Sequence, residues 1–163
     1  MKILITGGKS ATALKLIKAF GNYQVVLADY AEVPTFTSKA YSLISLGIKN
    51  EDTLAHTLLN KCLDEGIDLL LPIHHFEIEA VAKAKTLFNE FNIQLLLPSQ
   101  EELDQYVVEE ISKVSDWVVL KDGEIIFASN DEVRLSDINN ENLSGAFHLT
   151  IGNKRVKFSL ITI

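Results

Sequence analysis

Four residues that can bind ligands or transfer protons near neutral pH stand close together after a short apolar run. They are His74, His75, Glu77 and Glu79. Imidazole and carboxylate groups at this spacing favour acid–base chemistry or the binding of a polar ligand, which makes the segment the strongest site candidate. The alternative is an ordinary helix start, where the helix dipole favours Glu77 and Glu79.

A metal site is not predicted at this segment. Adjacent histidines cannot easily turn to one metal ion together, and no cysteine or further histidine stands at ligand spacing from His74 and His75. Cys62 is the only cysteine of the sequence, and its place on an apolar helical face predicts a core residue. The sequence identifies no cofactor.

A second candidate is the stretch that joins the first predicted strand to the first predicted helix. Its candidate ligand-binding residues are Gly7, Gly8, Lys9, Ser10 and Thr12. Glycines let backbone amides approach an anion and a helix N-terminus favours negative charge, so the stretch predicts a phosphate or carboxylate site. The alternative is that the tight turn needs glycine for its backbone alone. A P-loop is excluded, because Ile3 stands where that motif requires its first glycine.

Asp29 ends the second predicted strand, where dinucleotide-binding folds place a ribose-binding acid. The stretch before it lacks the third glycine of the G-x-G-x-x-G fingerprint. Asp29 is therefore either a ribose ligand or a turn residue. Arginine, the usual clamp for phosphate and carboxylate groups, occurs only as Arg134 and Arg155.

Five apolar runs predict strands that alternate with helical patterns between residues 1 and 115. The predicted strands are 2–6, 24–28, 42–46, 68–71 and 94–97. Continuous apolar runs are typical of parallel strands that are covered on both faces. We therefore predict an α/β fold, a three-layer Rossmann-like parallel sheet with strand order 3-2-1-4-5. In this order the loops after the first and fourth strands, 7–12 and 73–79, border one crevice.

From about Asp116 the helical spacing changes to the alternation of strands. Asp122-Gly123 and Gly152-Asn153 predict two hairpin turns. The expected pairs are Lys121 with Glu124, Leu120 with Ile125, Val118 with Phe127, Leu149 with Val156 and Phe147 with Phe158. We therefore divide the chain into a Rossmann-like domain, 1–115, and a small antiparallel β appendage, 116–163, packed on that domain or on a partner. The apolar face of the hairpin 146–163 suggests a homodimer.

Composition sets the class of protein. The 163 residues are 47% apolar and 23% charged, which is typical of a chain that folds around its own core. The net charge of −7 argues against nucleic acid as a partner. No apolar stretch is long enough for a membrane span or a signal peptide, so we expect no membrane association and a cytoplasmic location.

The sequence resembles the N-terminal, pre-ATP-grasp domain of the ATP-grasp superfamily, which includes the large subunit of carbamoyl-phosphate synthase and biotin carboxylase-like enzymes. The segments that carry the resemblance are 2–8, 26–29, 68–79 and 95–99. Such enzymes activate a carboxylate with ATP and magnesium, and a later domain pair holds the ATP. The residues after 115 are too few for that pair, so the resemblance implies the fold and a small-ligand crevice without the ATP-grasp domain.

These observations predict a stand-alone pre-ATP-grasp-like domain that binds a small anionic ligand or a protein partner without catalysis. The candidate ligand-binding residues are Gly7, Gly8, Lys9, Ser10, Thr12, Asp29, His74, His75 and Glu77. One alternative is an NAD-dependent or nucleotide-sugar enzyme of the Rossmann type. Another is the substrate side of a split ATP-grasp ligase whose nucleotide domain belongs to a second chain.

Overall fold

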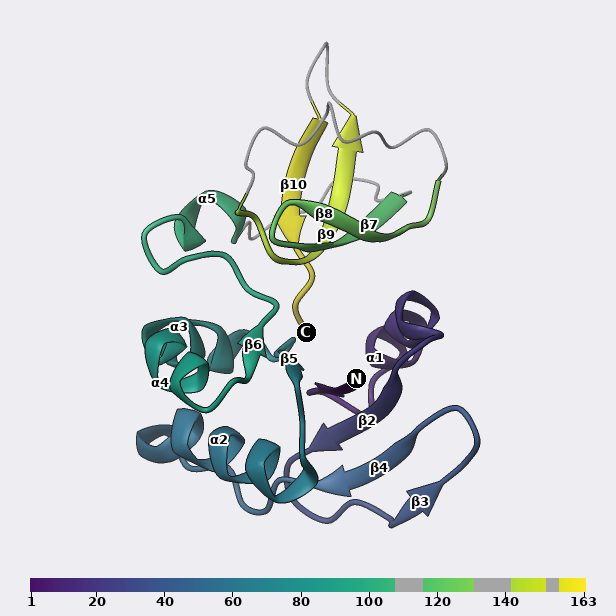
Figure 1. The fold of residues 1–163 in the computed structure, drawn as a ribbon, viewed down its shortest axis with the longest axis vertical. Coiled ribbons are helices and arrows are strands. Elements are labelled where there is room, and N and C mark those ends of the chain that lie inside the picture. The colour runs from purple at the N-terminus through teal and green to yellow at the C-terminus, as the bar shows by residue number, and fades with distance from the viewer. Residues whose placement is uncertain (108–115, 131–141, 152–155) are drawn as a thin grey trace. The chain divides into compact units, whose positions relative to one another are not determined.

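The computed structural model describes residues 1–107, 116–130, 142–151 and 156–163. The chain divides into two compact units (Figure 1). Unit 1 comprises Met1–Leu95 together with Thr162–Ile163, and unit 2 comprises Leu96–Ile161. The domain boundary expected at 115/116 adjoins residues 108–115, which lie outside the described ranges, so it stays a prediction.

Unit 1 contains a six-stranded sheet. Its strands are β1 (Lys2–Ile5), β2 (Gln24–Asp29), β3 (Phe36–Thr37), β4 (Ser42–Ser45), β5 (Leu69–Leu71) and β6 (Gln94–Leu95). The spatial order is β3-β4-β2-β1-β5-β6, and every pair is parallel except β3 with β4. The predicted α/β fold and strand order 3-2-1-4-5 are confirmed. The short antiparallel edge strand β3 was not predicted.

Helices cover both faces of this sheet. They are α1 (Ala11–Leu16), η1 (Ile17–Phe20), η2 (Glu51–Thr53), α2 (Leu54–Glu65), α3 (His75–Lys83) and α4 (Lys85–Glu90). Helix α1 lies on one side of the sheet, and α2, α3 and α4 lie together on the other (Figure 1). The Asn50 side chain accepts from the Asp52 N–H at the start of η2, and Gly66 ends α2 in a left-handed conformation.

The core of unit 1 is made by the central strands and by the inner faces of the helices. Ile3, Leu4 and Ile5 of β1 have no exposed surface, as expected of a strand covered on both sides. Cys62 of α2 is also fully buried, and burial raises the pKa of its thiol to about 12. This confirms that Cys62 is a core residue.

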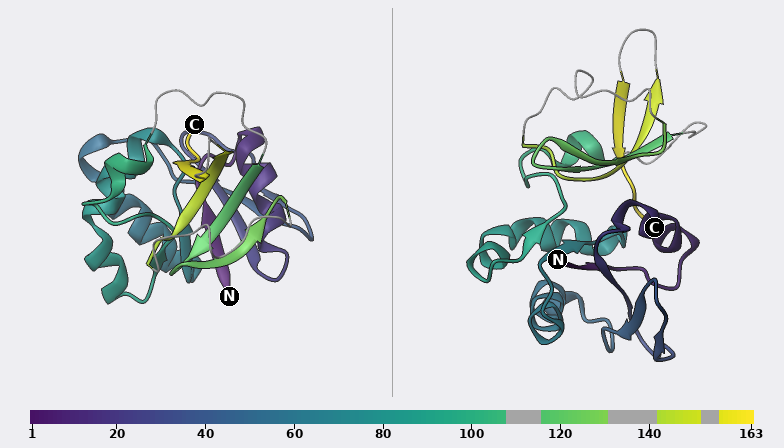
Figure 2. Two further views of the ribbon diagram at one scale, coloured as in Figure 1. Left: turned by 90° about the horizontal axis from the view of Figure 1, so that it is seen from above. Right: turned by 45° about the vertical axis from the view of Figure 1, so that its right-hand side comes forward.

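Unit 2 contains a four-stranded antiparallel sheet (Figure 2). Its elements are α5 (Leu103–Tyr106), β7 (Asp116–Lys121), β8 (Glu124–Ala128), β9 (Gly145–Ile151) and β10 (Val156–Leu160), and the strand order is β10-β9-β7-β8. The predicted antiparallel appendage is therefore confirmed. Its core includes Trp117 and Phe147, both buried.

The predicted register of the first hairpin, β7 with β8, is confirmed at the turn and wrong beyond it. Asp122 and Gly123 have φ of 50° and 76°, as a type I′ turn requires, and the pairs of Lys121 with Glu124 and of Leu120 with Ile125 are confirmed. Phe127 pairs with Val119 instead of Val118. The register shifts between Val119 and Leu120, which is the effect of a β-bulge.

The register of the second hairpin differs from the prediction by two residues. Leu149 pairs with Phe158 instead of Val156, and Phe147 pairs with Leu160 instead of Phe158. The predicted turn Gly152-Asn153 falls in 152–155, outside the described residues. Because the difference is an even number of residues, the same side chains remain on one face of the sheet.

Among the described residues, no helix is long and apolar enough to cross a membrane.

Candidate functional site

Asp29 is the centre of a polar cluster at the carboxyl end of β2. The Oδ2 atom accepts a hydrogen bond from the Lys9 main-chain N–H at 2.9 Å, and Oδ1 accepts one from the Tyr30 N–H at 2.8 Å. The Nε2 atom of His74 lies 3.2 Å from the same Oδ1. The Asp29 side chain is only 8% exposed. Both of its oxygens therefore already have partners inside unit 1.

Glu77, in the first turn of α3, is the centre of a second polar cluster and is fully buried. Its Oε2 accepts from the Thr6 hydroxyl and its Oε1 accepts from the Tyr30 hydroxyl, both at 2.6 Å. Thr6 in turn accepts from the Ile73 N–H at 2.8 Å. These bonds tie the ends of β1, β2 and β5 to the start of α3.

Burial shifts the pKa of both Glu77 and Tyr30. It raises the pKa of Glu77 above its ordinary 4.5, and the hydrogen bonds from Thr6 and Tyr30 offset part of the rise. Burial and the neighbouring Glu77 carboxylate raise the pKa of Tyr30 as well, so its hydroxyl remains a donor.

The raised pKa of Glu77 gives a testable pH dependence. The folded chain retains this proton above pH 4.5, whereas the unfolded chain releases it near 4.5. The contribution of Glu77 to stability is thus greatest below pH 4.5 and falls as pH rises through the raised pKa.

We expect the melting temperature of the wild type, relative to Glu77→Gln, to fall as pH rises from 4 towards 8, because glutamine does not titrate. Thermal melts of both proteins across this range would measure it. Because one proton is involved, the free energy of unfolding cannot change by more than about 1.4 kcal/mol per pH unit. A difference that rises with pH, or stays constant, would contradict the raised pKa.

Three main-chain amides of the glycine stretch already have acceptors within unit 1. The N–H groups of Gly8, Lys9 and Ser10 donate to Ala28 O, Asp29 Oδ2 and Gly7 O, respectively. Ser10 caps α1 by accepting from the Ala13 N–H, and Thr12 is half-buried in α1. These bonds favour the structural interpretation of the stretch over the anion cradle.

Close packing explains both glycines. Gly7 has φ of +67°, and a Cβ there would lie 2.5 Å from Ile163 Cδ1. A Cβ on Gly8 would lie 3.0 Å from the Ala28 main-chain nitrogen. Neither position accepts a side chain without displacing its neighbours.

His74 and His75 open α3 in different ways. His74 is the N-cap residue but makes no side-chain cap, and its ring stacks on Phe76 with centroids 4.8 Å apart. The His75 side chain is exposed, while its main-chain N–H donates to Ile163 O at 3.0 Å. The Ile163 N–H donates to Ile73 O at 2.8 Å, so Ile163 lies beside the end of β5.

The rings of Tyr30, His74 and Phe76 contact one another and extend the polar cluster around Asp29 towards the loop after β4. The Tyr30 ring contacts both His74 and Phe76, with centroid separations of 5.7 and 5.5 Å. The Lys49 ammonium lies 4.3 Å from the centroid of Phe76, a cation–π contact. Phe76 is 36% exposed, so part of this face is open to solvent.

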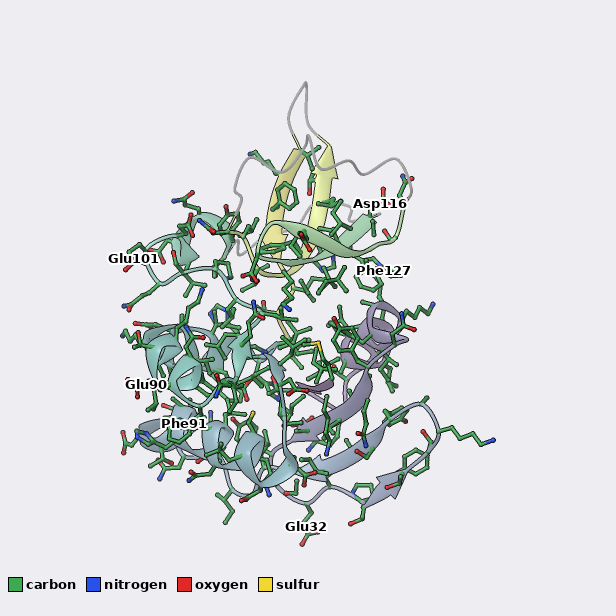
Figure 3. The ribbon with its side chains drawn as sticks, viewed as in Figure 1. Glu32, Glu90, Phe91, Glu101, Asp116 and Phe127 are labelled. Atoms are coloured by element: carbon green, nitrogen blue, oxygen red, sulfur yellow. The ribbon has the colours of Figure 1, made fainter. Side chains whose placement is uncertain are left out.

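A mainly apolar pocket of about 850 Å³ opens between the loops that follow β2 and β4. It is lined by Ala31, Glu32, Val33, Pro34, Ser45, Gly47 and Ile48. Ala31 directly follows Tyr30, so the pocket adjoins the polar cluster along the chain. Glu32 is exposed and points outward (Figure 3). The volume is within the usual range for small-molecule sites.

Within the described ranges, no group of three or more histidine, cysteine, aspartate or glutamate residues is placed to hold a metal ion. The exposed Glu79 pairs with Lys83 on the outside of α3, and this contact lowers the pKa of Glu79. Arg134 and Arg155 fall outside the described residues.

No protein-family model and no curated protein matches the chain. Among solved structures, the chain is similar to glycinamide-RNase-transformylase T from Mycobacterium tuberculosis, with a TM-score of 0.50 and 12% sequence identity. The alignment covers 100% of this chain and 71% of that chain. At this identity the similarity to the transformylase concerns the fold alone.

The structure brings four of the predicted residues together at the carboxyl edge of the parallel sheet: Lys9, Asp29, His74 and Glu77. Sequence reasoning missed Thr6 and Tyr30, which hold Glu77. The sequence did contain a signal for them, because Thr6 and Tyr30 each carry a hydroxyl group directly after an apolar strand. Ile163 was also missed, and nothing in its local sequence marks it as a neighbour of Gly7.

Proposed function

We propose that the chain is a pre-ATP-grasp-like α/β domain that binds a small anionic ligand at the carboxyl edge of its parallel sheet, without catalysis. One observation carries the proposal. The two acids, Asp29 and Glu77, are buried and satisfied by internal donors, whereas the His75 side chain is exposed and His74 is partly exposed. Lys9 is exposed as well, and its ammonium donates one hydrogen bond to Tyr30 O at 3.0 Å. An incoming ligand therefore meets basic groups, although the whole chain carries a charge of −7.

The same bonds support a binding role over catalysis. A general base must reach a substrate proton, but both carboxyl groups accept hydrogen bonds from groups of the chain itself. The adjoining pocket provides an apolar surface for the rest of the ligand.

The nicotinamide alternative has less support. A ribose-binding acid must offer a carboxylate oxygen to the ribose hydroxyls, whereas the Asp29 oxygens are held by Lys9, Tyr30 and His74. The split-ligase alternative remains compatible with the similarity to the transformylase. It predicts that activity with ATP would appear only when a second chain supplies the nucleotide domain.

A thermal-shift panel tests the proposal. The probes are inorganic phosphate, small carboxylates, Mg-ATP, ADP, NAD(H), NADP(H) and nucleotide sugars. A probe at 100 times its dissociation constant adds about 2.7 kcal/mol, which raises the melting temperature by several degrees. We expect a rise with phosphate or carboxylates that Lys9→Gln and His75→Gln diminish.

The matched control is Lys18→Gln, which removes an exposed positive charge in η1, beyond the far end of α1. It should leave the rise intact. A rise with NAD(H) that Asp29→Ala abolishes would instead support the nicotinamide enzyme. If no probe raises the melting temperature, the proposal fails, and a protein partner or a structural role becomes the better hypothesis.

A further inference from the structure

The pocket between the loops after β2 and β4 is built on hydrogen bonds that join these two loops. The Ala31 N–H donates to Gly47 O at 2.7 Å, and the Ser45 hydroxyl donates to Ala31 O, also at 2.7 Å. The Ser45 Oγ in turn accepts from the Gly47 N–H at 3.0 Å. All three of these residues line the pocket. The frame of the pocket is therefore fixed by the chain itself.

Ala31 has an uncommon backbone conformation in this frame. Its φ of +62° lies in the left-handed region, which residues other than glycine rarely adopt. Such a conformation persists only where the surrounding structure holds it, and residues of this kind cluster at ligand-binding sites. The two hydrogen bonds of the Ala31 main chain provide that restraint. The pocket is thus formed before a ligand arrives, which lowers the cost of binding.

Most of the pocket wall is apolar. Val33, Pro34 and Ile48 contribute to it, together with Ala31. Ile48 is 90% exposed, the largest exposed fraction among the large apolar side chains that the structure describes. A ligand that covers Ile48 would remove this apolar surface from water. The wall therefore favours a ligand with an apolar body.

Glu32 is the charged side chain that lines the pocket. Among the described residues, no lysine, arginine or histidine forms an ion pair with its carboxylate. Lys49 follows the lining residue Ile48 but already has partners, because its ammonium lies 2.9 Å from Glu51 Oε1 and contacts the ring of Phe76. The pocket thus has uncompensated negative charge at its edge, which favours a cation over an anion there.

We propose that this pocket binds a small organic amine, with the apolar part of the ligand against the wall and its ammonium beside the Glu32 carboxylate. The volume of about 850 Å³ suits a small molecule. Because Glu32 is exposed, its ion pair selects the charge of the ligand, whereas the apolar contact provides most of the affinity. None of the candidate residues of the anion site lines the pocket, so binding of an amine can be tested independently of the proposed function.

A titration of the full chain, followed by amide chemical shifts, tests the selection of charge. The probes have similar length and different charge: n-hexylammonium, n-hexanol and n-hexanoate. We expect hexylammonium to bind about two- to fivefold more tightly than hexanol, the range for one exposed ion pair, and hexanoate to bind least tightly. Glu32→Gln should remove the preference for hexylammonium over hexanol. Glu90→Gln is the matched control, because Glu90 is an exposed glutamate of α4, a helix that contributes no residue to the pocket (Figure 3).

Ile48→Ser tests the apolar wall in the same titration. Because Ile48 is almost fully exposed, the variant should fold normally, and it should bind hexylammonium and hexanol at least about threefold more weakly. Leu63→Ser, which changes an exposed leucine of α2, should leave both affinities unchanged. The amides of Ala31 and Gly47 should shift on binding, while that of Glu90 should not.

Three outcomes would overturn the amine site. Hexanol or hexanoate could bind the wild type as tightly as hexylammonium does, which would remove the role of Glu32. Binding could be the same in Glu32→Gln, Ile48→Ser and the wild type, which would place the probe elsewhere. Finally, no probe could bind at millimolar concentration. None of these results bears on phosphate or carboxylate binding, which the thermal-shift panel measures with other variants.

Discussion

Replacing Glu77 by alanine is expected to lower the free energy of unfolding of unit 1 by about 3 kcal/mol. The side chain has no exposed surface and accepts hydrogen bonds from the Thr6 and Tyr30 hydroxyls. Alanine would leave both donors buried without this acceptor and would open a cavity among β1, β2 and α3. A loss of this size lowers the melting temperature by several degrees in a chain of this length.

The matched control for this prediction lies two residues further along the same helix. Glu79→Ala removes an exposed glutamate that pairs with Lys83 on the helix surface, so we expect its melting temperature to equal that of the wild type. Glu77→Gln should fall between the two, because the amide keeps the volume but must turn its NH₂ towards one hydroxyl. Equal melting temperatures for Glu77→Ala and the wild type would show that the buried network contributes nothing to stability.

The parallel sheet was predictable because its signals are local. Each central strand is a continuous apolar run, and runs of that kind separated by helical patterns lead to few sheet topologies. The Asp122-Gly123 turn was likewise readable from two residues. The β-bulge between Val119 and Leu120 was not, because a bulge depends on how the partner strand packs, and no residue type specifies it.

The candidate site was predictable in its location and not in its bonding. Asp29 and His74 were expected at the carboxyl edge of the sheet, and in the structure the Asp29 Oδ1 and His74 Nε2 atoms lie 3.2 Å apart. The glycine stretch suggested an anion cradle, but its amides bond to neighbouring backbone and to Asp29. Whether an amide is free depends on the strand beside it, which the spacing of glycines does not reveal.

The second large effect is expected at Gly8. A Cβ at this position would lie 2.8 Å from Leu43 Cδ1, 3.0 Å from Leu27 Cβ and 3.0 Å from the Ala28 main-chain nitrogen. The Leu43 methyl group can rotate away, whereas the backbone of a central strand cannot. The loop cannot retreat either, because the Gly8 N–H donates to Ala28 O at 2.9 Å. We therefore expect Gly8→Ala to cost about 2–3 kcal/mol, the range for overpacking a core.

Gly21→Ala separates this steric cost from the ordinary effect of removing a glycine. Gly21 has helical backbone angles, with φ of −58°, and a Cβ there would meet nothing within 4 Å. Alanine at this position should stabilise the chain slightly, by about 0.4–1 kcal/mol, because it restricts the unfolded state. Chemical denaturation of both variants would measure the difference. If Gly8→Ala proved as stable as Gly21→Ala, contact with β2 would not explain Gly8, and a role of this glycine in ligand binding would become the better explanation.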